Sequence, residues 1–181
     1  VLISEELSLG KIEVSEDSTI TNISQLESAR LDVNNNKVLT VSNNFEIPQS
    51  KILSLIGTGN RILKINDSIK IFGKLYFGSE GYKIEDGIIN LDNSSIVDVD
   101  YDATIDSSIV IDGETTIDIL DGVTLFYTGN AIDIDGHKLT FLGDGSFSND
   151  EAIIISSSSL IVFSGSNQVT RIKVNSGSQN A

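Results

Sequence analysis

The most regular feature of the chain is a bulky hydrophobic residue that recurs every 22 positions. The series has eight members: Leu9, Leu31, Leu53, Leu75, Val97, Ile119, Phe141 and Phe163. A sustained period of this size is typical of stacked repeat proteins, in which each repeat buries its apolar side only against its neighbours. Because eight such repeats nearly fill the 181 residues, the period predicts one elongated domain.

Further hydrophobic series share this spacing and predict the shape of one repeat. One series is Ile88, Val110, Ile132 and Ile154, and another is Ala103, Leu125, Phe147 and Val169. Within a repeat the series lie about 9, 6 and 7 residues apart, which fits short strands joined by turns. We therefore predict an all-β fold, a single-stranded parallel β-helix (β-solenoid). It would have about eight rungs of about 22 residues, with three short strands in each rung.

Local patterns divide the chain into three parts. Runs such as Ile62–Ile65 and Thr116–Ile119 alternate apolar with polar residues, and Asp-Gly turns punctuate them. We predict a solenoid over residues 31–174 and a polar tail over 175–181. Residues 1–30 are less regular and could form a cap or a strand-exchange element, with a short helix between Ile20 and Leu31. An alternative is another all-β fold, such as a sandwich-type pilin or surface-layer domain.

Asparagines share one phase of the repeat at Asn22, Asn44 and Asn66, after which Ile88 takes over the position. Asparagines at equivalent turns of stacked rungs can form a side-chain amide ladder. Alternatively, they are ordinary turn residues that tolerate left-handed backbone. The Asn-x-Ser sequons at Asn22, Asn66 and Asn93 are expected by chance in a chain of this composition.

The net charge of −14 limits the classes of partner. Binding to nucleic acid or to an anionic membrane needs an excess of Lys and Arg, so we predict neither. No apolar stretch is long enough to span a membrane. The chain has no cysteine, so no disulfide stabilises the fold.

An alternating acidic segment is the clearest candidate for cation binding. Asp98, Asp100 and Asp102 would point the same way from an extended strand, and together with Asp92 and Asp106 they could bind calcium. The spacing is similar to that of an EF-hand loop, but Ala103 and Ile109 stand where that loop needs Gly and Glu, which excludes an EF-hand. The alternative is a solvated acidic strand face.

A second candidate is Asp133 and Asp135 beside His137, the single histidine of the chain. Acidic pairs can serve as general acid and base on a glycoside, but an Asp-Gly turn with an exposed histidine explains the same residues. We predict no catalytic, cofactor-binding or metal-binding residues, no cofactor and no enzymatic activity. The alternative functions are a β-helix polysaccharide lyase or hydrolase, and a carbohydrate-binding module.

The segment from Ile132 to Phe147, IDIDGHKLTFLGDGSF, resembles the repeats of secreted bacterial β-helix adhesins. Filamentous-haemagglutinin-like proteins and autotransporter passengers combine an apolar pair, an Asp-Gly turn and a Leu-Thr-Phe-type strand in this way. The resemblance covers Ser68 to Val174. It implies a right-handed parallel β-helix, an extracellular or cell-surface location and an adhesive or scaffolding role, and it transfers no binding or catalytic residue.

Both ends of the predicted solenoid look uncapped. Val1-Leu-Ile is apolar, and Val169–Val174 is still strand-like close to the polar tail. Bare strand edges recruit other strands. We therefore predict a structural module, a subunit of a surface filament or adhesin stalk, that associates with itself head to tail or by strand exchange. A host or cell-surface glycan is a further expected partner.

Overall fold

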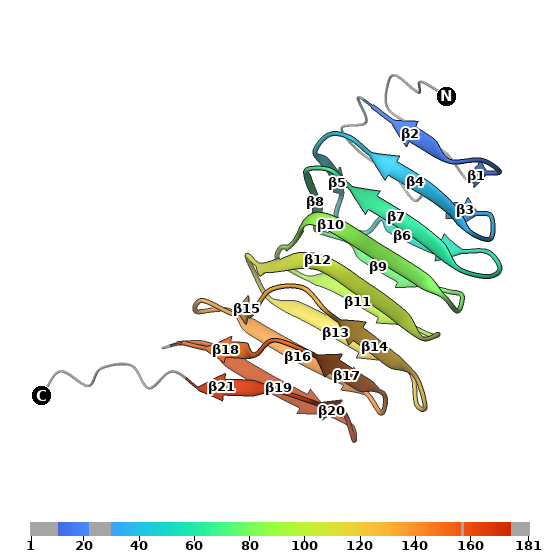
Figure 1. Cartoon of the computed structure of the whole chain (residues 1–181). Coiled ribbons are helices and arrows are strands. Elements are labelled where there is room, and N and C mark those ends of the chain that lie inside the picture. The colour runs from blue at the N-terminus through green and yellow to red at the C-terminus, as the bar shows by residue number, and fades with distance from the viewer. Residues whose placement is uncertain (1–10, 22–29, 157, 175–181) are drawn as a thin grey trace, which may run out of the picture.

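The protein is a parallel β-solenoid of about seven turns, seen in a computed structural model that describes residues 11–21, 30–156 and 158–174. Its strands stack in layers from the N-terminal to the C-terminal end (Figure 1). Each strand pairs with strands about 22 residues away, and every pairing among the described residues is parallel. The predicted fold class is confirmed, and a sandwich-type fold is excluded.

The described strands lie on three faces, and from residue 30 onward each turn contributes one strand to each face. The first face is β1 (Ile12–Val14), β3 (Arg30–Val33), β6 (Ile52–Ile56), β9 (Lys74–Phe77), β11 (Ser95–Val99), β13 (Thr115–Ile119), β16 (Lys138–Gly143) and β19 (Leu160–Ser164). The second face is β2 (Ser18–Ile20), β4 (Lys37–Val41), β7 (Arg61–Ile65), the first part of β10 (Tyr82–Leu91), the first part of β12 (Ala103–Ile111), β14 (Thr124–Tyr127), β17 (Ser146–Asn149) and β20 (Gln168–Val169).

The third face is built partly from strands that bend around a corner. It contains β5 (Phe45–Ile47), β8 (Ser68–Ile71) and the second parts of β10 and β12, and it continues as β15 (Ile132–Asp133), β18 (Ile153–Ile155) and β21 (Ile172–Val174). In β10 the register shifts between Glu85 and Ile88, where Asp86 and Gly87 have φ angles of 60° and 58°. This left-handed backbone turns the chain at the corner.

Alternation within the strands places one row of side chains inside the solenoid. Arg61, Leu63 and Ile65 of β7 are buried, while Ile62 and Lys64 are not. One continuous hydrophobic core results, running from Ile12 to Ile153. Because neighbouring turns supply most of each residue's packing, the core has no single centre.

The 22-residue series is not one column of stacked side chains. Leu53, Leu75 and Val97 do stack directly. Leu31, however, pairs with Leu55, 24 positions away, and Val99 pairs with Ile119, only 20 positions away. The series therefore alternates between two columns of the first face, which lie two residues apart and both point inward.

The other hydrophobic series have mixed outcomes. Ala103, Leu125, Phe147 and Val169 stack in register, as predicted. Ile88 and Val110, by contrast, are exposed and do not stack, because they pair with Ser108 and Asn90. Ile132 is buried but pairs with Ile153, so it does not stack on Ile154 either. Leu9 and most of the predicted helix between Ile20 and Leu31 lie outside the described residues.

The predicted amide ladder is wrong for its described members. The Asn44 side chain accepts hydrogen bonds from the backbone N–H and the hydroxyl of Ser68, at 3.0 and 2.7 Å, while the Asn66 amide reaches Ser42 at 3.4 Å. These partners are 24 residues apart, so the turns are offset and the two asparagines do not meet. Asn22 lies outside the described residues.

Replacing a buried residue of an inward column should destabilise the protein far more than replacing an exposed aromatic residue on a face. Phe77 is fully buried, whereas 42% of Phe126 is exposed. We expect Phe77→Ala to lower the free energy of unfolding by about 3–5 kcal/mol, because it leaves a cavity between two turns. Phe126→Ala should cost less than about 1 kcal/mol. Denaturant titrations followed by circular dichroism would test this, and equal losses would contradict the proposed packing.

Candidate functional site

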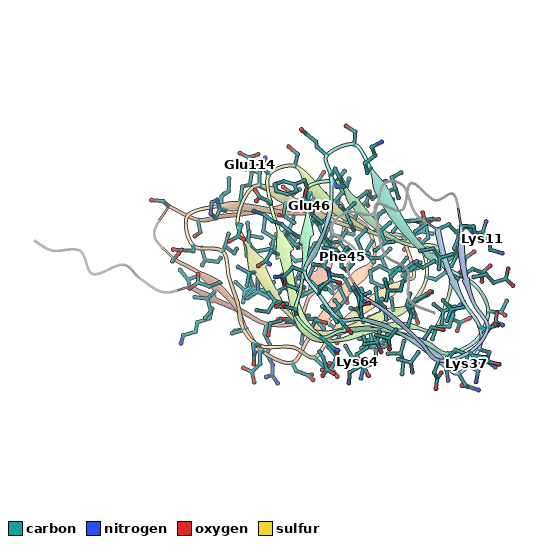
Figure 2. All side chains as sticks on the ribbon, turned by 90° about the horizontal axis from the view of Figure 1, so that it is seen from above. Lys11, Lys37, Phe45, Glu46, Lys64 and Glu114 are labelled. Carbon is teal, nitrogen blue, oxygen red and sulfur yellow. The ribbon has the colours of Figure 1, made fainter. Side chains whose placement is uncertain are left out.

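Lysines on the outer surface pair with acids of the following turn. Lys11 lies 3.0 Å from Asp32, and Lys64 lies 2.6 Å from Asp86. The same arrangement joins Lys70 to Asp92 at 3.2 Å, Lys74 to Asp98 at 2.7 Å and Lys83 to Asp106 at 2.9 Å. In Figure 2, Lys11, Lys37 and Lys64 lie at the rim, while Phe45 lies within the outline. These pairs therefore lie on the solvent side of the ladder.

The carboxylates of Asp98, Asp100 and Asp102 contact three different partners. Asp98 binds Lys74, Asp100 accepts a hydrogen bond of 2.7 Å from the Tyr76 hydroxyl, and Asp102 accepts one of 2.7 Å from the Thr124 backbone N–H. The expectation of a single extended strand is wrong here, because β11 ends at Val99. The hydrogen bond to Asp100 and partial burial raise the pKa of Tyr76 to about 12.

Asp92 and Asp106 also have partners of their own. Asp92 accepts a hydrogen bond from the backbone N–H of Asn93, and this bond and the contact with Lys70 lower its pKa. Lys83 and the Thr128 hydroxyl likewise lower the pKa of Asp106. Across the described residues no group of three or more acidic or histidine side chains is arranged to hold a metal ion.

Asp133, Asp135 and His137 form a corner of the solenoid. The Asp133 carboxylate accepts a hydrogen bond of 3.0 Å from the Asp135 backbone N–H, and Asp135 has a φ of 40°. The backbone N–H of His137 donates to the carbonyl of Ile134 at 3.0 Å, which closes the turn. The contacts are those of an Asp-Gly turn, the alternative interpretation of these residues.

One pair of acids is placed unfavourably. Asp98 of β11 and Asp118 of β13 are directly paired across neighbouring turns. Burial, followed by the charge of Asp98, raises the pKa of Asp118. Since the raised pKa means that the ionised form is disfavoured in the folded protein, Asp118 costs stability at neutral pH.

Arg61 was not singled out by sequence reasoning. Only 1% of this arginine is exposed, and its guanidinium carbon lies 4.7 Å from the centre of the Tyr82 ring. It donates to the carbonyl of Glu80, while its Nε and Nη1 atoms have no hydrogen-bond partner among the described residues. Burial lowers its pKa. The alternation of β7 was the available signal, because it places Arg61 on the same side as Leu63.

Polar side chains at the corners fasten one turn to the next. The Asp144 carboxylate accepts a hydrogen bond of 2.6 Å from the Ser166 backbone N–H. The buried Asn149 accepts bonds from the N–H groups of Thr170 and Arg171, both at 3.2 Å, and donates to the carbonyls of Glu151 and Arg171. Side-chain-to-backbone bonds of this kind, rather than an amide ladder, connect the corners.

The C-terminal end of the solenoid exposes its interior. Phe163 stacks on Phe141 with ring centres 5.6 Å apart, yet 45% of Phe163 is exposed. Ile172 and Val174 continue the inward columns of Ile153 and Ile155, and they are 41% and 70% exposed. At the other end, the inward residues Ile12 and Val14 are buried. The last turn therefore offers an apolar surface bordered by the outer edges of β19, β20 and β21.

Comparison with known proteins does not assign a family. The chain matches no protein-family model, no curated protein and no solved structure. In the part of the chain that the structure describes, no helix is long and apolar enough to cross a membrane. What the structure shares with β-helix proteins is the parallel β-solenoid fold.

Removing the charge of Asp118 should stabilise the protein in a pH-dependent way. Its pKa is raised above the ordinary 3.8, so the cost of ionisation is present at neutral pH and absent well below the unfolded pKa. We expect Asp118→Asn to gain roughly 0.5 kcal/mol at pH 7, the scale of a cross-strand like-charge pair, and little at pH 3. Denaturant titrations at both pH values, with Asp121→Asn at an exposed turn as control, would test this. A loss of stability at pH 7 would contradict it.

Proposed function

We propose that the protein is a structural module: a β-solenoid segment of an extracellular stalk, adhesin or filament that joins further β-strand turns end to end. The single observation that supports this most strongly is the open last turn, with Phe163, Ile172 and Val174 exposed on the inner side. Apolar side chains in register with a buried core, next to strand edges that have no partner among the described residues, are suited to receive another layer of strands.

The surface is consistent with a structural role in solution. Its net charge of −14 favours solubility and opposes unspecific aggregation along the faces. Outward acids such as Asp98 and Asp106 are occupied by lysines or hydroxyls. These acids thus fasten neighbouring turns to one another, which is a structural role.

An extracellular location is part of the same proposal. The repeat style of Ile132 to Phe147 resembles that of secreted β-helix adhesins, and a cysteine-free ladder does not depend on the redox state of its surroundings. The proposed role of the module is to lengthen a rod-shaped structure and to connect its parts, because stacking of similar turns produces a rod.

End-on association should depend on the exposed residues of the last turn and not on exposed residues of the faces. Phe163 at the end and Phe126 on the second face are similarly exposed, at 45% and 42%. We expect the wild type and Phe126→Ser to associate with increasing concentration. Phe163→Ser should associate at least about tenfold more weakly, because the interface loses roughly 1.4 kcal/mol of apolar burial. Sedimentation velocity and negative-stain microscopy would measure this.

A second variant distinguishes weaker association from damage to the fold. Val174→Ser removes a side chain that is 70% exposed and therefore packs little within the monomer. It should weaken association in the same direction while leaving the circular dichroism spectrum unchanged. A wild type that stays monomeric at high concentration would overturn the proposed function.

A further inference from the structure

Asp-Gly pairs occur at several turns of the chain, and their surroundings in the structure differ. They begin at Asp86, Asp112, Asp121, Asp135 and Asp144. An aspartate followed by glycine is chemically labile, because glycine has no side chain to shield the backbone nitrogen that can attack the aspartate carboxyl group. In a folded protein the attack also needs room for the peptide to reorient. The packing around each pair therefore decides where the reaction occurs.

The pair Asp121-Gly122 lies in a corner that is longer than the corners stacked on either side of it. Three successive corners join positions that are in register on the first and second faces: Val99 to Ala103, Ile119 to Leu125 and Gly143 to Phe147. The chain advances by four positions in the first and third corners and by six in the middle one. The middle corner therefore has two residues without a counterpart in the neighbouring turns.

This additional length keeps the pair away from its neighbours. Asp121 and Gly122 are exposed, and a side-chain carbon placed on Gly122 would have no other atom within 4 Å. The hydrogen bond that closes the corner, from the Val123 N–H to the Leu120 carbonyl at 3.0 Å, involves neither residue. Among the described residues, the Asp121 carboxylate and the Gly122 N–H have no hydrogen-bond partner. Both reacting groups are thus accessible to each other and to water.

The other Asp-Gly pairs are held by adjacent turns. Side-chain carbons placed on Gly87, Gly113 and Gly145 would lie 2.6, 2.5 and 2.5 Å from a backbone atom of the preceding turn, so these glycines are tightly packed. Gly136 has open space around it, but its N–H donates to the Ser159 hydroxyl of the following turn at 2.8 Å. That bond occupies the nitrogen that would have to attack.

We propose that Asp121 is a site of spontaneous covalent modification, at which aspartate converts to isoaspartate in the folded protein. The Gly122 nitrogen bonds to Cγ of Asp121 and loses its proton, and the carboxyl hydroxyl leaves as water, which closes a cyclic imide. Water then opens the ring. Cleavage at the side-chain carbonyl restores aspartate, whereas cleavage at the backbone carbonyl leaves a chain that runs through the side chain. Water is the only co-reactant.

The modification changes the corner and leaves the core in place. Isoaspartate adds one carbon atom to the backbone between β13 and β14 and attaches the carboxylate directly to Cα. Exposed loop tips tolerate such a change, because few contacts depend on their exact path. Ile119 and Leu125, on either side, are buried and paired with both adjacent turns. The modified protein should therefore stay folded, and the proposal is independent of the end-to-end function.

Ageing of the folded protein in heavy-oxygen water tests the proposal. Ring opening places a solvent oxygen in the product whichever bond breaks, so peptide mapping by tandem mass spectrometry reports the reaction at each Asp-Gly pair. We expect Asp121 to acquire the label, and isoaspartate, at least about tenfold faster than Asp86, Asp112, Asp135 or Asp144. A tenfold difference corresponds to about 1.4 kcal/mol of local opening free energy, which the held pairs need before they react.

Two controls separate the effect of the fold from that of the dipeptide. In denaturant all the Asp-Gly pairs should react at similar rates, because their surroundings are then alike. Asp121→Glu keeps the charge at this exposed corner but requires a larger ring, so label at this position should disappear while the circular dichroism spectrum stays unchanged. A folded protein in which Asp121 reacts no faster than Asp112 would overturn the proposal. An excess at Asp121 that persists in denaturant would overturn it too.

Discussion

The constraint on which this structure depends is that a parallel β-strand needs a hydrogen-bonding neighbour on both sides. In a solenoid each turn provides that neighbour for the turns before and after it, and the same stacking buries the inward side chains. Leu63, for example, is enclosed because β4 and β10 flank β7. Stability is therefore distributed along the rod, and in the last described layer β19, β20 and β21 each have a described neighbour on one side.

This constraint tolerates uneven turns. Pairing steps on the first face range from 19 residues for Ile12–Leu31 to 24 residues for Leu31–Leu55, so the mean stays near 22 while individual turns differ in length. Odd and even steps alike pair inward residues with inward residues, as in Ile12–Leu31 and Tyr82–Ala103, because an inverted pairing would turn an apolar row outward. The corners absorb the difference, and the left-handed residues Asp86 and Gly87 are one example.

The sequence was sufficient for the architecture because the architecture follows from period and alternation. The three-stranded turn and the parallel ladder could both be predicted from hydrophobic series such as Ala103, Leu125 and Phe147. The pairing register could not, because turns of unequal length place Asn44 opposite Ser68 and not opposite Asn66. The exposure of Ile88 could not be predicted either, since it depends on where β10 bends.

For the candidate site, the sequence indicated which residues are acidic but not which partners they contact. The sequence predicts that Asp98, Asp100 and Asp102 form one row on a strand. In the structure each contacts a different group, namely Lys74, Tyr76 and the Thr124 backbone. Each partner lies about one turn away, so its identity follows only from the register. For Arg61 the position could be predicted and the partners could not. The alternation of β7 places it inside, whereas its charge argues against burial. The Tyr82 ring and the Glu80 carbonyl, which only the structure reveals, explain how the charge is accommodated.

Charge and packing therefore contribute differently to the structure of this rod. The cross-turn ion pairs are at least partly exposed to solvent and contribute little to stability individually, while the buried columns supply the cohesion. Because the ion pairs nevertheless share one direction, they give the rod a polarity that an apolar core lacks. The register of neighbouring turns is thus marked outside by charge pairs such as Lys74–Asp98, and inside by apolar columns such as Leu53, Leu75 and Val97.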